Sequence, residues 1–345
     1  MYTIQPCSFI LEPHKEQETN RKNGCEKMST ITTVNGKRVK TSWWLRLIRH
    51  FSSKYQLYLM LLPAVVLLIC FYYVPMYGLQ LAFRKYTPQM GLTGGDFVGA
   101  KYIKKFIQSY QFWTLIKNTL SISITSLLLC FPFPIILALV INQIRRPDAK
   151  QFVQTVAYIP HFISTVAMVG MVKIMLSPST GLWGYLYAFF DAKAPNVLAT
   201  PSSFKWLYAC IQLWQHTGWN SIIYVAALSS VDVQLYDAAK VDGANRLQQM
   251  WNIELPSILP TIIILLILNV GHLLGASFEM IYLLQNDANI AASEVISTYV
   301  YKIGIKASNQ ISYSTAIGLF NNVVNFVILI VINAISNKVT QTSLF

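Results

Sequence analysis

The chain has 345 residues, of which 54% are hydrophobic and only 12% are charged, and its mean hydropathy is +0.44. The apolar residues form runs that are too long for a soluble core and too numerous for a cleaved signal peptide, so we predict a polytopic membrane protein. The net charge is +13, but the basic residues are spread out rather than aligned with aromatic residues, which favours anionic lipid headgroups over nucleic acid as the counterpart.

Residues 1–55 are predicted to lie outside the membrane. The first forty are polar and lack apolar periodicity, which is typical of a disordered tail. Residues 43–51 mix aromatic, aliphatic and cationic side chains, as a helix lying in the membrane interface does. The wet end of the first membrane span explains this short stretch equally well.

Six apolar runs follow, each near or above the ~20 residues that are needed to cross a bilayer. An even number of spans places both termini on one side, and basic residues between the second and third spans favour the cytoplasm for that side. Other basic residues, between positions 84 and 117, would then lie outside, so charge alone leaves the orientation open. The six predicted spans of the domain 56–345 cover residues 56–83, 118–143, 152–176, 205–229, 257–282 and 312–335.

Residues 230–256 form a polar loop between the fourth and fifth spans. Apolar residues at spacings of three and four predict a short amphipathic helix on each side of Gly243, where glycine permits a sharp turn. Pro256 is expected to end the second helix. Such a helical hairpin, held by spans on both sides, is suited to dock into a groove of a soluble partner. A cytoplasmic loop with one face resting on the bilayer is the alternative.

Polar side chains recur along one face of three predicted spans, where they are costly unless they face protein or water. They would line a pathway for a polar substrate, with amides and carboxylates meeting its hydroxyl groups and aromatic rings offering flat apolar faces. Hydrogen bonds between helices, typically worth ~0.6 kcal/mol each, are the alternative. The predicted pathway residues are Gln212, Trp214, His216, Trp219, Asn220 and Tyr224 on the fourth span, Asn269, His272 and Glu279 on the fifth, and Asn321 and Asn325 on the sixth.

The loop from Asp237 to Pro256 resembles the "EAA" loop of ABC importer permeases, in which Glu-Ala-Ala precedes a glycine and then an apolar residue with proline. Aspartate replaces the usual glutamate at position 237, which keeps the charge but shortens the side chain by a methylene. The resemblance implies that the loop transmits ATPase movements to the membrane helices. The residues implied in this coupling are Asp237, Ala238, Ala239, Asp242, Gly243, Ala244, Arg246 and Pro256.

Three kinds of role are expected within this set. The alanines would give a small, close-packing face, and Gly243 would set the angle between the two helices. Asp237, Asp242 and Arg246 would contact the partner through polar groups. For Asp242 and Arg246, four residues apart, a local helical ion pair worth only ~0.2–0.5 kcal/mol is the alternative.

Residues 50–338 also look like the permeases of the LplB-type carbohydrate importers of Gram-positive bacteria, for example at Pro75–Phe83, Tyr158–Ser164 and Thr298–Gly304. The resemblance implies a type I, MetI-like permease with six transmembrane helices in the bacterial cell membrane, taking up oligosaccharides or polysaccharide fragments. It also implies the partners: a second, similar permease in a heterodimer, two ATPase subunits and an extracellular lipid-anchored binding protein.

The same resemblance implies that this chain is not an enzyme and binds no cofactor, because ATP and Mg would bind the ATPase subunits. The chain has no G-x-x-x-x-G-K-[ST] motif, which agrees with this expectation. None of its five cysteines pairs with another at metal-ligand spacing, so no metal site is expected.

Two other classes of protein stay open. A secondary transporter driven by an ion gradient would be expected to show inverted repeats or membrane-embedded carboxylates, and Glu279 is the one acidic residue inside a predicted span. A membrane enzyme acting on lipid-linked glycans would need paired carboxylates or a metal cluster, and the nearest such pair, Asp237 and Asp242, fits the docking loop better.

Overall fold

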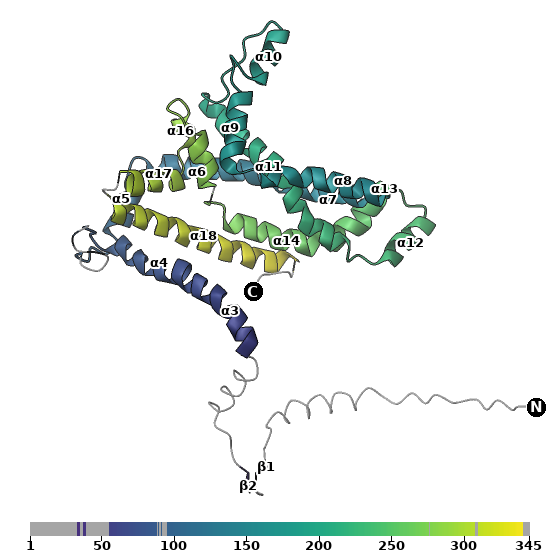
Figure 1. Cartoon of the computed structure of the whole chain (residues 1–345), viewed down its shortest axis with the longest axis horizontal. Helices are drawn as coiled ribbons and strands as arrows, with labels where there is room; N and C mark the ends of the chain where they lie inside the picture. The colour runs from purple at the N-terminus through teal and green to yellow at the C-terminus, as the bar shows by residue number, and fades with distance from the viewer. Residues whose placement is uncertain are drawn as a thin grey trace, which may run out of the picture. The chain divides into compact units, whose positions relative to one another are not determined.

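The structure is a computed structural model, which describes residues 33–34, 37–38, 55–87, 89, 91, 95–275, 277–307 and 310–340 (Figure 1). The chain divides into two compact units, Met1–Pro75 and Met76–Phe345. Within the predicted tail, the described residues form two short antiparallel strands, β1 (Thr33–Val34) and β2 (Lys37–Arg38). The interfacial helix predicted at 43–51 lies outside the described residues.

The first unit ends in a long apolar helical run. It contains α3 (Tyr55–Leu68) and the π-helical turn η1 (Ile69–Tyr73), and none of their residues is buried. The run goes on through α4 (Val74–Met76) and the 3-10 helix η2 (Tyr77–Phe83). The whole segment Tyr55–Phe83 is long and apolar enough to cross a membrane, and it coincides with the first predicted span.

Three more helical segments of the second unit pass the same test of length and apolarity. The first, Phe112–Asn142, joins α6 (Phe112–Cys130) to α7 (Pro132–Asn142) and begins six residues before the predicted span 118–143. The second is Arg246–Gly271. The last, Ile311–Lys338, lies within α18 (Ile311–Thr340). The predicted mostly helical, polytopic architecture is therefore confirmed. The described residues contain four helices long and apolar enough to cross a membrane, or up to six candidate spans if each of two bent helix pairs counts as one.

The third predicted span, 152–176, is not one helix. Its first part comprises α8 (Pro147–Tyr158) and the 3-10 turn η4 (Ile159–Phe162), and its second part, α9 (Thr165–Met175), is bent from the first by 94°. The bend follows Pro160, which cannot donate a backbone hydrogen bond, and Ser164 then caps α9 by accepting from the N–H of Ala167 at 3.3 Å. The third predicted span is therefore a pair of helices joined at a sharp bend.

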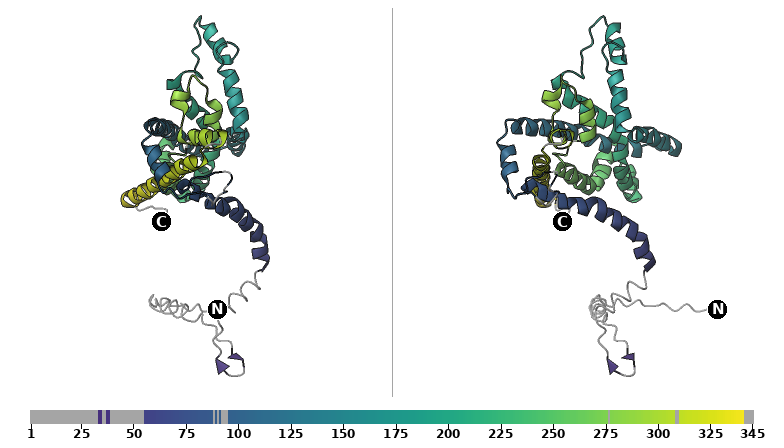
Figure 2. Two further views of the ribbon diagram at one scale, coloured as in Figure 1. Left: turned by 90° about the vertical axis from the view of Figure 1, so that its left-hand side faces the viewer. Right: turned by 60° about the vertical axis from the view of Figure 1, so that its left-hand side comes forward.

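The fourth predicted span is α11 (Phe204–Leu228), an unbroken helix that packs against α6, α7, α8 and α14. Before it stand α10 (Leu182–Phe189), which projects beyond its neighbours (Figures 1 and 2), and the short turn η5 (Pro201–Ser203). A Cβ atom at Gly218 would collide with the carbonyl oxygen of Ala157 in α8. Glycine is therefore what lets these two helices approach so closely.

The fifth predicted span, 257–282, is wrong at both ends. α13 (Arg246–Gln249), the π-helical turn η6 (Met250–Glu254) and α14 (Leu255–Gly271) form one continuous segment, and the chain then breaks before α15 (Phe278–Leu284). Pro256 does not end a helix as predicted. The helical segment runs through it, and the π-helical turn η6 stands just before it.

The other helices stand at the ends of the second unit. α12 (Val233–Val241) lies at one end and α5 (Lys101–Ile107) at the opposite end, as Figure 1 shows. α16 (Ile290–Ser293), α17 (Ile296–Tyr301) and the π-helical turn η7 (Lys302–Lys306) complete the unit. Three clusters of buried apolar side chains hold the unit together, one of them joining α7, α11 and α14.

Candidate functional site

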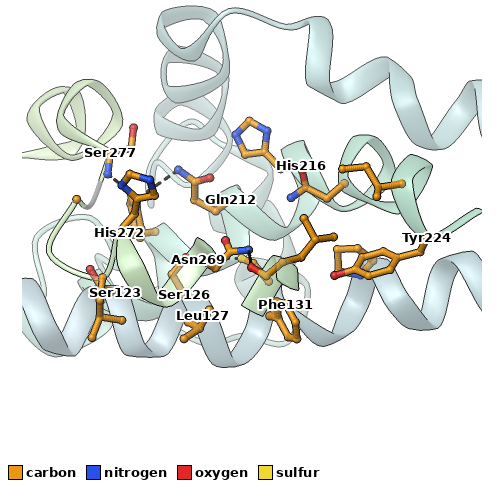
Figure 3. A pocket seen from close by; sticks show the side chains of 18 residues that line it. Ser123, Ser126, Leu127, Phe131, Gln212, His216, Tyr224, Asn269, His272 and Ser277 are labelled. Carbon is orange, nitrogen blue, oxygen red and sulfur yellow. Dashed lines mark hydrogen bonds between the residues drawn. The ribbon is translucent and has the colours of Figure 1, made fainter. Parts of the chain in front are cut away.

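A cavity of about 390 Å³ lies between α6, α7, α11, α14 and the chain break that follows α14 (Figure 3). This volume is in the range of pockets that bind small ligands. The residues that line it are Ser123, Ser126, Leu127, Cys130, Phe131, Pro134, Tyr208, Gln212, His216, Asn220, Ile223, Tyr224, Leu265, Asn269, His272, Leu273, Gly275 and Ser277.

One face of α11 supplies the polar wall of the cavity. Tyr208, Gln212, His216, Asn220 and Tyr224 follow one another at intervals of four, so they share that face. The Tyr208 hydroxyl accepts hydrogen bonds from Gln212 Nε2 at 3.2 Å and from the backbone N–H of residue 277 at 3.1 Å. This wall offers amides, an imidazole and hydroxyl groups, which suit the hydroxyl groups of a sugar.

The opposite wall comes from α14 and from the break at 272–277. Asn269 and His272 lie there, as predicted for the pathway. Glu279 does not, because α14 ends at Gly271 and Glu279 is carried by α15 on the far side of the break. The predicted continuous polar face of the fifth span is therefore wrong, and only its first two residues reach the cavity.

Asn321 and Asn325 of α18 brace this break instead of lining the cavity. Asn325 Oδ1 accepts from the N–H of Leu274 at 3.0 Å, and Asn321 Nδ2 donates to the carbonyl oxygen of the same residue at 3.4 Å. These amides replace backbone hydrogen bonds that a break in the helix loses, and their role in the pathway stays a prediction. At the break of the third span, Gln215 of α11 donates in the same way to the carbonyl oxygen of Ile163 at 2.9 Å.

The two tryptophans predicted to meet a sugar ring also lie outside the cavity lining. Trp214 is 52% exposed and belongs to another face of α11. Trp219 stacks on the ring of His161, with centroids 4.3 Å apart and planes 5° apart. His161 Nδ1 in turn lies 3.2 Å from His216 Nδ1. Of the predicted aromatic residues, Tyr224 alone lines the cavity.

The predicted hairpin after α11 is built from two well-defined helix ends. α12 ends in a Schellman motif, in which the N–H of Ala244 donates to the carbonyl oxygen of Ala239 at 2.8 Å and Gly243 has a φ of 75°. α13 begins with a reciprocal capping box between Asn245 and Gln248, at 2.7 and 2.9 Å. The Asn-x-x-Gln spacing of this box is visible in the sequence, but it was not predicted as the start of a helix.

The predicted coupling residues lie at the hairpin surface or near it. Asp237, Ala238, Asp242 and Arg246 are exposed, and so is Pro256, whereas the two other alanines, at 239 and 244, are half-buried. Asp237 forms an exposed ion pair with Lys240 at 2.8 Å. The alternative of a helical pair between Asp242 and Arg246 is wrong, because Gly243 separates them into two helices.

The hairpin carries a patch of exposed apolar side chains, which we call the apolar knob. Exposed apolar patches of this kind mark interaction sites. The members of the knob are between 50% and 88% exposed: Val233, Leu235, Val241, Leu247 and Trp251. Glu254, which stands directly before Leu255-Pro256, was not predicted as a functional residue. A carboxylate between apolar residues was the signal that could have found it.

Residues 130–341 match the family described as "Binding-protein-dependent transport system inner membrane component". The chain is 42% identical over 299 residues to the polygalacturonan/rhamnogalacturonan transport system permease protein YteP of Bacillus subtilis (strain 168), covering 87% of this chain and 92% of that protein. It is 38% identical over 289 residues to protein LplB of the same organism, covering 84% and 91%. A bacterial alginate ABC transporter, solved in complex with alginate pentasaccharide-bound periplasmic protein, contains a chain that matches with a TM-score of 0.78 at 39% identity, covering 87% of this chain and 100% of that chain.

Proposed function

The chain belongs to the family of binding-protein-dependent transport system inner membrane components, and on that premise we propose how its cavity and its hairpin share the work of import. It is a membrane permease subunit of an ATP-driven ABC importer and is not itself an enzyme. The predicted MetI-like fold and the LplB-type resemblance are confirmed. A secondary transporter driven by an ion gradient, the alternative left open by the sequence, is corrected by the same similarities.

The proposed substrates are oligosaccharides or polysaccharide fragments. The substrate class comes from the relatives: one is named as a polygalacturonan/rhamnogalacturonan permease, and a similar solved structure is that of an alginate transporter. The polar wall of α11 and the residues facing it support the proposal with hydrogen-bonding groups for hydroxyls and carboxylates. The residues proposed to contact the substrate are Gln212, His216, Asn220, Tyr224, Asn269 and His272.

The hairpin is the proposed docking element for an ATPase subunit. The observation that carries this proposal is the exposed apolar knob, whose side chains lie on either side of two capped helix ends. An exposed apolar surface on a helix is of the kind that docks into a groove. The short connection from α7 to α8, with Arg145 and Arg146, lies at the same end, because Asn142 of α7 and Tyr236 of α12 are hydrogen bonded. This arrangement supports a cytoplasmic hairpin and two cytoplasmic termini.

The remaining partners follow from this scheme. The chain acts with a binding protein, proposed to be extracellular and lipid-anchored, and pairs with a second homologous permease above two ATPase subunits. Those ATPases would bind ATP and Mg, so that this chain needs no cofactor of its own. Closure of the ATPase dimer would pull the hairpin and switch the cavity between an inward-open and an outward-open state.

The test is ATP-dependent uptake by the complete complex in proteoliposomes, with fragments of polygalacturonan and of alginate as probes. The native hairpin is compared with Asp237→Arg and Gly243→Pro, and Asp148→Arg serves as the control for charge reversal, since Asp148 is an exposed residue of the α7–α8 end. Both hairpin variants should insert normally and lose complex assembly or substrate-stimulated ATPase activity, whereas the control should keep both. Full assembly and stimulation in both hairpin variants would refute the docking proposal.

A further inference from the structure

A buried carboxylate lies directly beneath the coupling hairpin. Glu254 is the last residue of η6, and its exposed fraction is 0%. Its Oε1 atom accepts three hydrogen bonds, from Asn142 Nδ2 at 2.7 Å, from Gln143 Nε2 at 2.8 Å and from the Tyr236 hydroxyl at 3.3 Å. A buried carboxylate is costly to desolvate, so a residue kept in this place calls for a reason beyond packing.

The three donors come from two elements that are far from Glu254 in sequence. Asn142 and Gln143 are the last residue and the C-cap of α7, and Tyr236 stands in the middle of α12. Asn142 Nδ2 also lies 3.4 Å from the Tyr236 hydroxyl, which closes the cluster. Glu254 is therefore the point where the hairpin, the end of α7 and the start of α14 are joined.

Both membrane helices that meet at this point reach the cavity. At its other end α7 brings Pro134 to the cavity, next to its N-cap residue Phe131, and α14 brings Asn269 there. From Glu254 to Asn269 the helix covers fifteen residues, which is about 22 Å at 1.5 Å per residue. A displacement of α12 that is passed on through Glu254 thus acts on two walls of the cavity.

The second oxygen of the same carboxylate has no partner. Oε2 is buried and forms no hydrogen bond in the described residues. The two oxygens of a carboxylate are equivalent acceptors, so the Tyr236 hydroxyl can pass from Oε1 to Oε2 while the two amides keep their bonds. Burial and then the neighbouring Glu254 carboxylate raise the pKa of Tyr236 above its ordinary value.

We propose that Glu254 is a positioning residue for transport, whose carboxylate ties α12 to α7 and α14 and so transmits movements of the hairpin to the cavity. The spare oxygen lets the connection persist while α12 tilts. This inference rests on the proposed function of the hairpin and adds to it the residue through which the force passes.

A purely structural brace predicts something different. It would lower the amount of folded protein when removed, but each complex that forms would still transport the usual number of substrate molecules per ATP. The decisive quantity is therefore the coupling ratio, substrate imported per ATP hydrolysed, measured on purified complete complexes in proteoliposomes with polygalacturonan fragments. This ratio is independent of how much complex is recovered.

The variant Glu254→Gln keeps the shape of the side chain and replaces one of its two acceptor oxygens by an amide donor. We expect ATP hydrolysis to continue and the coupling ratio to fall ~5-fold or more, the range of a typical coupling between sites. Tyr236→Phe removes one donor and leaves the two amides, so we expect a smaller fall in the ratio. The double variant should lose little beyond Glu254→Gln alone, because the two residues act through one contact.

The matched control is Glu294→Gln. Glu294, the C-cap residue of α16, is partly buried and paired with Lys302 of η7 at 3.0 Å. It lies away from the hairpin, so its replacement should leave the coupling ratio unchanged. A native ratio in Glu254→Gln would overturn the inference, as would equal falls in variant and control. Should Glu254→Gln fail to fold, a native ratio in Tyr236→Phe overturns the inference in its place. Absence of ATP-dependent uptake in the native complex would instead overturn the proposed function, and this inference with it.

Discussion

Replacing Gly243 by alanine tests whether the backbone geometry of the hairpin matters for docking. The φ of Gly243 is 75°, and a Cβ atom added there would meet no atom within 4 Å, so the substitution introduces backbone strain without any steric clash. For a residue with a Cβ atom, this left-handed conformation costs about 1–2 kcal/mol. If only the intact turn presents the apolar knob, the apparent affinity for the ATPase should fall by about 5- to 30-fold.

The assay is a binding titration of the ATPase onto the permease pair in lipid nanodiscs. Gly243→Asn should weaken binding less than Gly243→Ala, because asparagine enters the left-handed region more readily than most residues. Gly170→Ala is the control, since a Cβ at Gly170 also meets open space but on a backbone of ordinary φ. Native affinity in Gly243→Ala, or weaker binding by the asparagine variant than by the alanine variant, would refute the reasoning.

Three further substitutions test the packing and the cavity. Gly218→Ala should lower the melting temperature, because its Cβ would collide with the carbonyl of Ala157 and overpacking costs about 1–3 kcal/mol; an unchanged melting temperature would contradict the close approach of the helices. Asn325→Leu should destabilise the protein by about 1–3 kcal/mol, because the N–H of buried Leu274 loses its acceptor; an unchanged free energy of unfolding would contradict this role of Asn325. Asn220→Ala should raise the KM for uptake with little change in protein stability; a native KM would remove this residue from the substrate contacts.

The long apolar runs allowed the positions of most spans to be predicted, because span hydrophobicity is a local property of the sequence. The two breaks could not be predicted in this way. At Leu274 the break is held by amides of α18, which are about fifty residues away in sequence, and no local pattern signals them. Pro256 misled the prediction in the opposite direction, since the helical segment runs through it after the π-helical turn η6.

The candidate site could likewise be predicted where its residues share one helix, and not where segments distant in sequence meet. The polar residues of α11 were predicted to share a face because α11 is an uninterrupted helix, and the structure brings Gln212, His216 and Asn220 to one cavity. The extrapolation to Glu279 failed where the helix it assumed does not exist. Glu254 escaped prediction because its partners Asn142 and Gln143 are more than a hundred residues distant.

The two breaks decide which faces of this subunit can meet lipid. Hydrocarbon offers no hydrogen-bonding group, so an interrupted backbone is stable in a bilayer only where protein or water satisfies it. Gln215 supplies the amide at one break, and Asn321 and Asn325 supply it at the other. The sides of α11 and α18 that carry these amides are therefore expected to face protein or water and not acyl chains. Lipid at these sides would leave the backbone groups at the two breaks without hydrogen bonds.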